Sequence, residues 1–78
     1  MGLVYEVVKL DPSGKTVGYV RIGNDRYTSD HSKALARAGQ LTDACIDEDG
    51  NWKCKDIGGY EVVATQVADL PRRRNARR

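Results

Sequence analysis

The chain has no phenylalanine, one tryptophan, one histidine and two cysteines among its 78 residues. A core must therefore consist of valine, leucine, isoleucine and alanine side chains, in a domain whose net stability is only about 5 kcal/mol. So small a margin does not support a large internal cavity. We therefore expect one small domain with no small-molecule substrate and no cofactor.

Long apolar runs are absent as well. A membrane-spanning helix needs roughly 18 to 20 apolar residues, and no stretch of this sequence approaches that length. The N-terminus also lacks the basic and then apolar layout of a signal peptide. These absences predict a cytoplasmic protein that makes no contact with a membrane.

Catalytic and metal-binding side chains are also scarce. His31 is the only histidine, and on a helix it would not face the neighbouring Ser29 or Ser32. Cys45 and Cys54, together with a single histidine, fall short of the four ligands of a structural zinc site. We expect a protein without enzymatic activity and without a metal.

Charge is unevenly distributed along the chain. Residues 1–70 contain eight lysines and arginines and all eleven acidic residues, whereas the last eight residues contain five arginines and no acid. We predict a single domain over residues 1–70 and a disordered basic tail over residues 71–78. The candidates for binding nucleic-acid phosphates are Arg72, Arg73, Arg74, Arg77 and Arg78. The alternative interpretation of this tail is a solubilising end without a partner.

Two strands are predicted at the start of the chain, over residues 3–10 and 16–22. Between them, the DPSGK segment places proline and glycine as a three-residue hairpin loop requires. The predicted partners are Asp11 with Lys15, Val7 with Tyr19, and Tyr5 with Arg21. The aliphatic face, which should receive a helix, carries Val4, Val8, Leu10, Val20 and Ile22, with Glu6 as the exception.

The other face of this hairpin is a candidate binding surface. It carries aromatic rings and cations at Tyr5, Lys9, Tyr19 and Arg21. Rings and cations together are typical of single-strand nucleic-acid binding, and tyrosine and arginine are equally typical of protein interfaces. A third interpretation is that this face packs under another part of the sheet.

One helix is predicted, over residues 29–39. Ser29 is suited to cap its first turn and Gly39 to end it in a left-handed conformation. Ala34, Leu35 and Ala38 form its apolar stripe. We expect Leu35 to be central to the core.

A second hairpin is predicted over residues 41–47 and 52–57. A two-residue loop would place Cys45 opposite Cys54, where a disulfide is conceivable. We favour a three-residue loop, because it places Ile46 opposite Trp52 and separates apolar from charged side chains. In that register both cysteines are predicted to be free thiols, and the acidic residues at the tip form a solvated loop.

A last strand is predicted over residues 60–67, ending at Asp69-Leu70-Pro71. The DPSGK turn, the TSDHSKALARAG helix entry and the closing Leu-Pro resemble a family of small bacterial and phage domains of unknown function. In that family the closing segment is rich in Asn and Leu, and here only Asp69-Leu70-Pro71 matches it. The resemblance implies a compact fold of order β-β-α-β-β-β and carries no activity across.

Taken together, these patterns predict an α+β domain with a mostly antiparallel sheet of four to five strands and one helix on one face. Its expected function is non-catalytic binding of a nucleic acid or nucleoprotein complex through the basic tail and the Tyr/Arg sheet face. The alternative is a small phage-type inhibitor or adaptor, for example one acting against host defence, that binds another protein.

Overall fold

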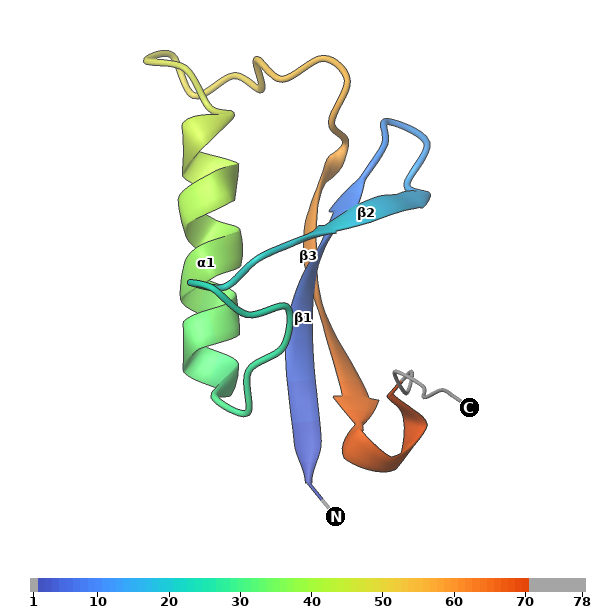
Figure 1. Ribbon diagram of the computed structural model, residues 1–78. Helices are drawn as coiled ribbons and strands as arrows, with labels where there is room; N and C mark the ends of the chain where they lie inside the picture. The colour runs from blue at the N-terminus through green and yellow to red at the C-terminus, as the bar shows by residue number, and fades with distance from the viewer. Residues whose placement is uncertain (1, 71–78) are drawn as a thin grey trace.

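The computed structural model describes residues 2–70, and it shows one antiparallel sheet with one helix against it (Figure 1). The elements are β1 (Leu3–Leu10), β2 (Thr16–Val20), α1 (His31–Ala44), β3 (Gly59–Gln66) and a short 3-10 helix, η1 (Val67–Asp69). The sheet has three strands in the order β2-β1-β3. The α+β class is therefore as expected, but the predicted sheet of four to five strands is wrong.

The hairpin of β1 and β2 contains a bulge that the sequence analysis did not predict. Its tip is as expected, because the Asp11 amide donates to the Lys15 carbonyl at 2.9 Å. Beyond the tip, Leu10 pairs with Thr16 but Lys9 pairs with Gly18, which leaves Val17 as an extra residue. An extra residue turns every later side chain of that strand to the other face.

This bulge overturns the predicted faces of the hairpin. Val7 pairs with Val20 and Val8 with Tyr19, instead of Val7 with Tyr19. The helix lies on the face that carries Tyr5, whose ring centroid is 4.6 Å from that of His31 at the start of α1. The prediction that the opposite, aliphatic face receives the helix is therefore wrong.

Helix α1 is longer than predicted and begins two residues later, at His31. Asp30, rather than Ser29, caps it, because its Oδ1 accepts from the amides of Ser32 at 3.0 Å and Lys33 at 3.4 Å. The helix continues through Gly39 to Ala44. A glycine inside a helix costs about 1 kcal/mol, which the burial gained by the last turn outweighs.

The buried side of α1 follows a regular spacing. Ala34 is completely buried, Ala38 and Leu41 are half-buried, and Cys45 at the C-cap is buried. These positions recur every three or four residues, as expected for one face of a helix. Leu35 points away and is 52% exposed, so its predicted role in the core is wrong.

The predicted second hairpin does not form, because residues 41–44 belong to α1. The favoured loop is correct in one respect, since Ile46 does lie opposite Trp52. That bridge is isolated, however, and the chain beyond it is not held in a ladder. Cys54 is therefore free to reach Cys45, and the two form a disulfide with their Cα atoms 5.2 Å apart. The prediction of two free thiols is wrong.

The junction between this loop and β3 fits tightly against the first hairpin. The Gly58 amide donates to the Leu10 carbonyl at 2.7 Å. A Cβ atom at Gly58 would overlap the Asp11 carbonyl group. Glycine is therefore required here for a close approach of two backbones. β3 then pairs with β1 along its whole length, from Leu10 opposite Gly59 to Leu3 opposite Gln66.

Candidate functional site

The residues of the predicted Tyr/Arg sheet face lie on two different faces of the sheet. Tyr5 and Lys9 alternate with Val8 along β1 and lie on the helix side, where both are half-buried. Tyr19 pairs with Val8 and therefore lies on the opposite face, where it is 43% exposed. Arg21 follows β2 and is exposed. The tail arginines, from Arg72 to Arg78, lie outside the described residues.

Tyr19 belongs to a cluster around Arg26. The Arg26 guanidinium carbon lies 4.1 Å from the centroid of the Tyr19 ring and 5.1 Å from that of Tyr27. Its Nε donates to Glu6 Oε1 at 3.1 Å, and this hydrogen bond raises the pKa of Arg26. The Glu6 side chain is almost buried, so it requires a partner of this kind. The cluster covers the sheet face away from α1.

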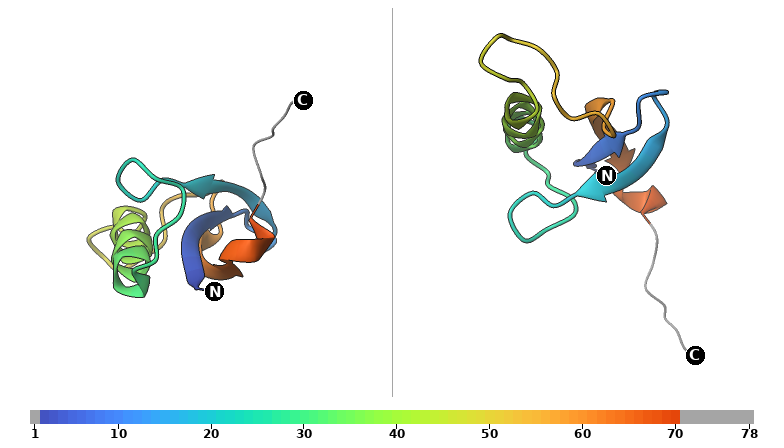
Figure 2. Two further views of the ribbon diagram at one scale, coloured as in Figure 1. Left: turned by 60° about the horizontal axis from the view of Figure 1, so that its bottom comes forward. Right: turned by 90° about the horizontal axis from the view of Figure 1, so that it is seen from above.

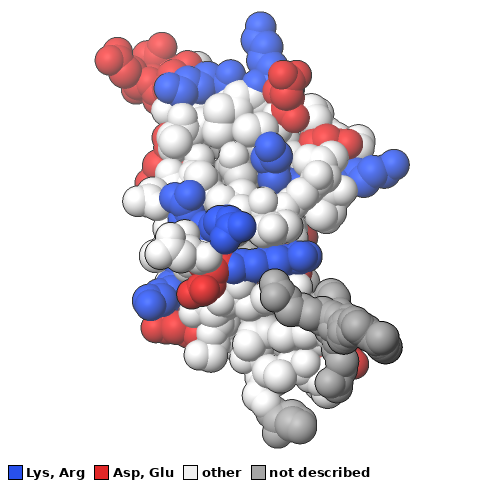
Figure 3. Space-filling view, in the orientation of Figure 1, with Lys and Arg blue, Asp and Glu red and all other residues white. Residues whose placement is uncertain are grey.

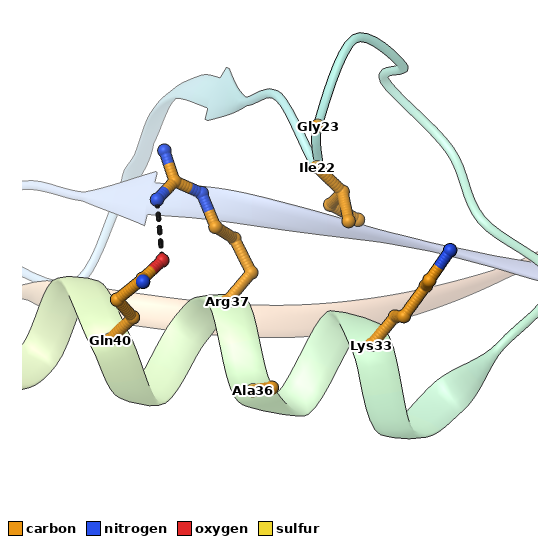
Figure 4. A pocket seen from close by; sticks show the side chains of 6 residues that line it. All are labelled: Ile22, Gly23, Lys33, Ala36, Arg37 and Gln40. Atoms are coloured by element: carbon orange, nitrogen blue, oxygen red, sulfur yellow. Dashed lines mark hydrogen bonds between the residues drawn. The ribbon is translucent and has the colours of Figure 1, made fainter.

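A separate group of basic side chains surrounds a pocket between α1 and the loop after β2. The pocket has a volume of about 290 Å³ and is open to solvent. Its lining residues are Ile22, Gly23, Lys33, Ala36, Arg37 and Gln40. We call this set the basic pocket. Lys33 and Arg37 rise from the same side of α1, with Ile22 between them (Figure 4).

Arg37 is held in place by two hydrogen bonds. Its Nε donates to the Arg21 carbonyl at 3.0 Å, and its Nη1 donates to Gln40 Oε1 at 2.8 Å. Since a guanidinium has five N–H groups, about three of them stay available to a ligand. The orientation of this cation is therefore fixed by the fold while part of its binding capacity is unused.

In the part of the chain that the structure describes, the cations in and beside the basic pocket have no acidic partner. Within residues 2–70 the only ion pair joins Arg26 to Glu6, so Arg21, Lys33 and Arg37 are not neutralised by a salt bridge. Lys33 makes no hydrogen bond through its ammonium group to any described residue. The pocket lining offers only cationic and amide hydrogen-bonding side chains and contains no carboxylate, which suits an anionic ligand.

Acidic side chains gather elsewhere. Figure 3 shows several basic side chains across the middle of one face and a group of acidic side chains at one end. That end carries the loop after α1, where Asp47, Glu48 and Asp49 are exposed, as the prediction of a solvated tip requires. The Asp47 carboxylate accepts from the amides of Asp49 and Asn51, both at 2.9 Å, and so shapes the loop.

We next consider metal ions and membranes, for which the described residues offer no candidate site. No group of three or more His, Cys, Asp or Glu side chains within residues 2–70 is arranged to hold a metal ion. His31 lies beside Tyr5 at the start of α1, whereas Cys45 is at the C-cap of the same helix. No helix in the described part of the chain is long and apolar enough to cross a membrane.

Lys33 and Arg37 are not among the site residues predicted from the sequence. Their spacing of four residues was a usable signal, because side chains at i and i+4 are neighbours on a helix. What the spacing does not show is that Ile22 and Gly23 close the other wall of the pocket. That wall depends on the path of the chain after β2.

Comparison of the chain with protein-family models, curated proteins and solved structures gives no match. The resemblance to small bacterial and phage domains therefore stays a prediction. The element order that it implies differs from the observed order β-β-α-β.

Proposed function

We propose that this protein is a non-catalytic binding protein that engages a nucleic acid through its basic pocket. The observation that carries the proposal is the placement of Lys33 and Arg37 on one face of α1, beside an open pocket and without an acidic partner within residues 2–70. A cation that is not neutralised by an acidic side chain favours the binding of an anion from solution, and the hydrogen bonds of Arg37 also fix its orientation.

The shape of the pocket favours a phosphate of a polymer over a small free ligand. Small-molecule sites are typically enclosed and about 300 to 1,000 Å³ in volume. This pocket is at the lower limit of that range and is open. An open basic site leaves room for a chain to continue on both sides of the bound phosphate group.

Arg21 extends the same surface. Its backbone carbonyl accepts the hydrogen bond from Arg37, and its own Nη1 donates to the Asn24 carbonyl at 3.0 Å. The arginine-rich sequence of residues 71–78 would add five more charges to any contact with a polyanion. None of these contacts reads a base edge, so the proposal is binding without sequence specificity.

The test is fluorescence anisotropy with a labelled single-stranded RNA, repeated over a range of salt concentrations. Lys33→Ala/Arg37→Ala should weaken binding and reduce the slope of log K against log salt by about 1.4, since each phosphate neutralised by the protein contributes about 0.7 on a single strand. The matched control is Lys53→Ala/Lys55→Ala, which removes the same charge from outside the pocket.

Equal losses in the two double variants would mean that only total charge matters, and would contradict a site at the pocket. Replacing the five tail arginines with serine measures the contribution of residues 71–78 separately. A partner captured from cells that persists after nuclease treatment and at about 0.5 M salt would instead support the inhibitor or adaptor alternative, because surface charges are strongly screened at that concentration.

A further inference from the structure

We propose that this chain forms a symmetric dimer in which the free edge of β3 pairs with β3 of a second copy. β3 is the last strand on one side of the sheet. An unpaired strand edge presents a row of N–H and C=O groups that can extend the sheet. The proposal concerns the side of the sheet opposite to β2, so it is independent of the basic pocket.

The pairing of β1 and β3 shows which backbone groups are free. The Val67 amide donates to the Gly2 carbonyl at 3.1 Å, next to the pair Leu3 and Gln66. Because hydrogen-bonded pairs alternate in an antiparallel ladder, the backbone groups that point away from β1 belong to Tyr60, Val62, Ala64 and Gln66. Within residues 2–70 these groups have no hydrogen-bond partner.

β3 also lacks the features that usually prevent edge pairing. Its sequence, GYEVVATQ, contains no lysine, no arginine and no proline, and Glu61 is its only charge. It is eight residues long and is rich in β-branched and aromatic side chains. Ala64 is exposed although its side chain is on the helix side, which shows that α1 does not cover this end of the strand. In Figure 2, α1 lies on one face of the sheet, where it contacts both β1 and β3.

A second copy of the chain fits this edge in one particular register. An antiparallel pair centred on Val63 places Val62 opposite Ala64 and Tyr60 opposite Gln66, with about eight backbone hydrogen bonds across the interface. On the other face it places Glu61 opposite Thr65 of the second copy. The single charge of the strand therefore meets a hydroxyl and not another carboxylate. The free backbone groups of β3 are arranged symmetrically about Val63, so this register pairs all of them with the same groups of a second copy and brings no like charges together, which is why we commit to a second copy as the occupant.

Such a dimer has a continuous six-stranded sheet of order β2-β1-β3-β3-β1-β2. Its two-fold axis is perpendicular to the sheet, so both α1 helices lie on the same face. In each copy the basic pocket is next to the loop after β2, and β1 separates β2 from the β3 interface. Both pockets therefore remain open in the dimer.

The test is sedimentation velocity of the full chain from about 1 µM to about 500 µM, because association depends on protein concentration. We expect a reversible shift from monomer to dimer. A chain that is monomeric over this whole range would overturn the proposal.

Charge variants test the register. Thr65→Glu would place a carboxylate opposite Glu61 of the second copy and should raise the dissociation constant about twofold to thirtyfold, whereas Thr65→Lys should lower it by a similar factor. Within one chain residues 61 and 65 are about 13 Å apart along the strand, so the effect is intermolecular.

The double variant Glu61→Lys/Thr65→Glu should return the dissociation constant toward that of the Thr65→Lys variant, since it restores opposite charges. Circular dichroism at a concentration where all variants are monomeric controls for unfolding. Equal effects of Thr65→Glu and Thr65→Lys would overturn the register and the interface with it.

Discussion

Arg26 donates to Glu6 across the face of the sheet that α1 does not cover, and the guanidinium lies 4.1 Å from the centre of the Tyr19 ring. The Glu6 side chain is 12% exposed and that of Arg26 is 43% exposed. A carboxylate in this position is stable only while a cation covers it. Glu6 is the exception on the apolar face predicted from the sequence, and its pairing with Arg26 explains why it is there.

Arg26→Ala should therefore lower the free energy of unfolding by about 1 to 3 kcal/mol, because it leaves a nearly buried carboxylate unpaired. The measurement is urea denaturation. Glu6→Gln in the Arg26→Ala background should recover part of the loss, since it removes the unpaired charge. If the two substitutions are simply additive, the pair is not coupled.

Gly58→Ala should destabilise the protein by about 1 to 3 kcal/mol or more, because the added methyl group overlaps the Asp11 carbonyl. Gly39→Ala is the matched control. No atom lies within 4 Å of a Cβ at Gly39, which is inside α1, so that substitution should stabilise the protein by about 1 kcal/mol. Thermal unfolding of the two variants should move in opposite directions.

Leu35→Ala should leave the stability nearly unchanged, within about 0.5 kcal/mol, because the side chain is half exposed. Val7→Ala should cost about 2 kcal/mol, since Val7 is completely buried between the sheet and the helix. Chemical denaturation of both variants locates the core. A larger loss for Leu35→Ala than for Val7→Ala would contradict the observed orientation of α1.

Cys45 and Cys54 should not react with an alkylating reagent in denaturant unless the protein is first reduced. Mass spectrometry of the alkylated chain measures this directly. Loop closure over about ten residues predicts that Cys45→Ala/Cys54→Ala lowers the free energy of unfolding by about 2 to 3 kcal/mol. Two alkylated thiols before reduction would contradict the disulfide.

Asp11 should titrate below the ordinary aspartate range. A hydrogen bond from the Ser13 hydroxyl lowers the pKa of this carboxyl most, followed by one from the Lys15 amide. Because its pKa is lower in the folded state, its contribution to stability is present above about pH 3.9 and is lost as the pH falls through the folded value. Carbon-detected NMR should show that Ser13→Ala raises this pKa, while Ser29→Ala, distant in sequence from the turn, should not.

The sequence was informative where a local rule decides the structure. The DPSGK turn, the strand over residues 3–10 and the loop that places Ile46 opposite Trp52 all follow from turn chemistry and alternation. The helix is predicted in the right part of the chain, but its predicted end comes too early. Gly39 is well suited to end a helix, and the tertiary burial of the following turn outweighs that preference. No local feature of the sequence indicates that burial outweighs the capping preference of Gly39.

The candidate site could not be predicted for a different reason. A bulge is not visible in an alternating pattern, and this one separates Tyr19 from Tyr5. The disulfide was missed because strand alternation was applied to residues that lie in a helix and a loop. The basic pocket depends on Ile22 and Gly23 meeting α1, which is a contact between segments distant in sequence.

The bulge at Val17 makes the first hairpin tolerant of a change in chain length at this point. Loss of the single codon for residue 17 would place Thr16 next to Gly18 in an unbroken ladder, and residues 18–20 would keep their partners on β1. Tyr19 would stay opposite Val8, and Arg26 would keep the ring beneath it. The same deletion in a strand without an extra residue would turn every later side chain to the other face.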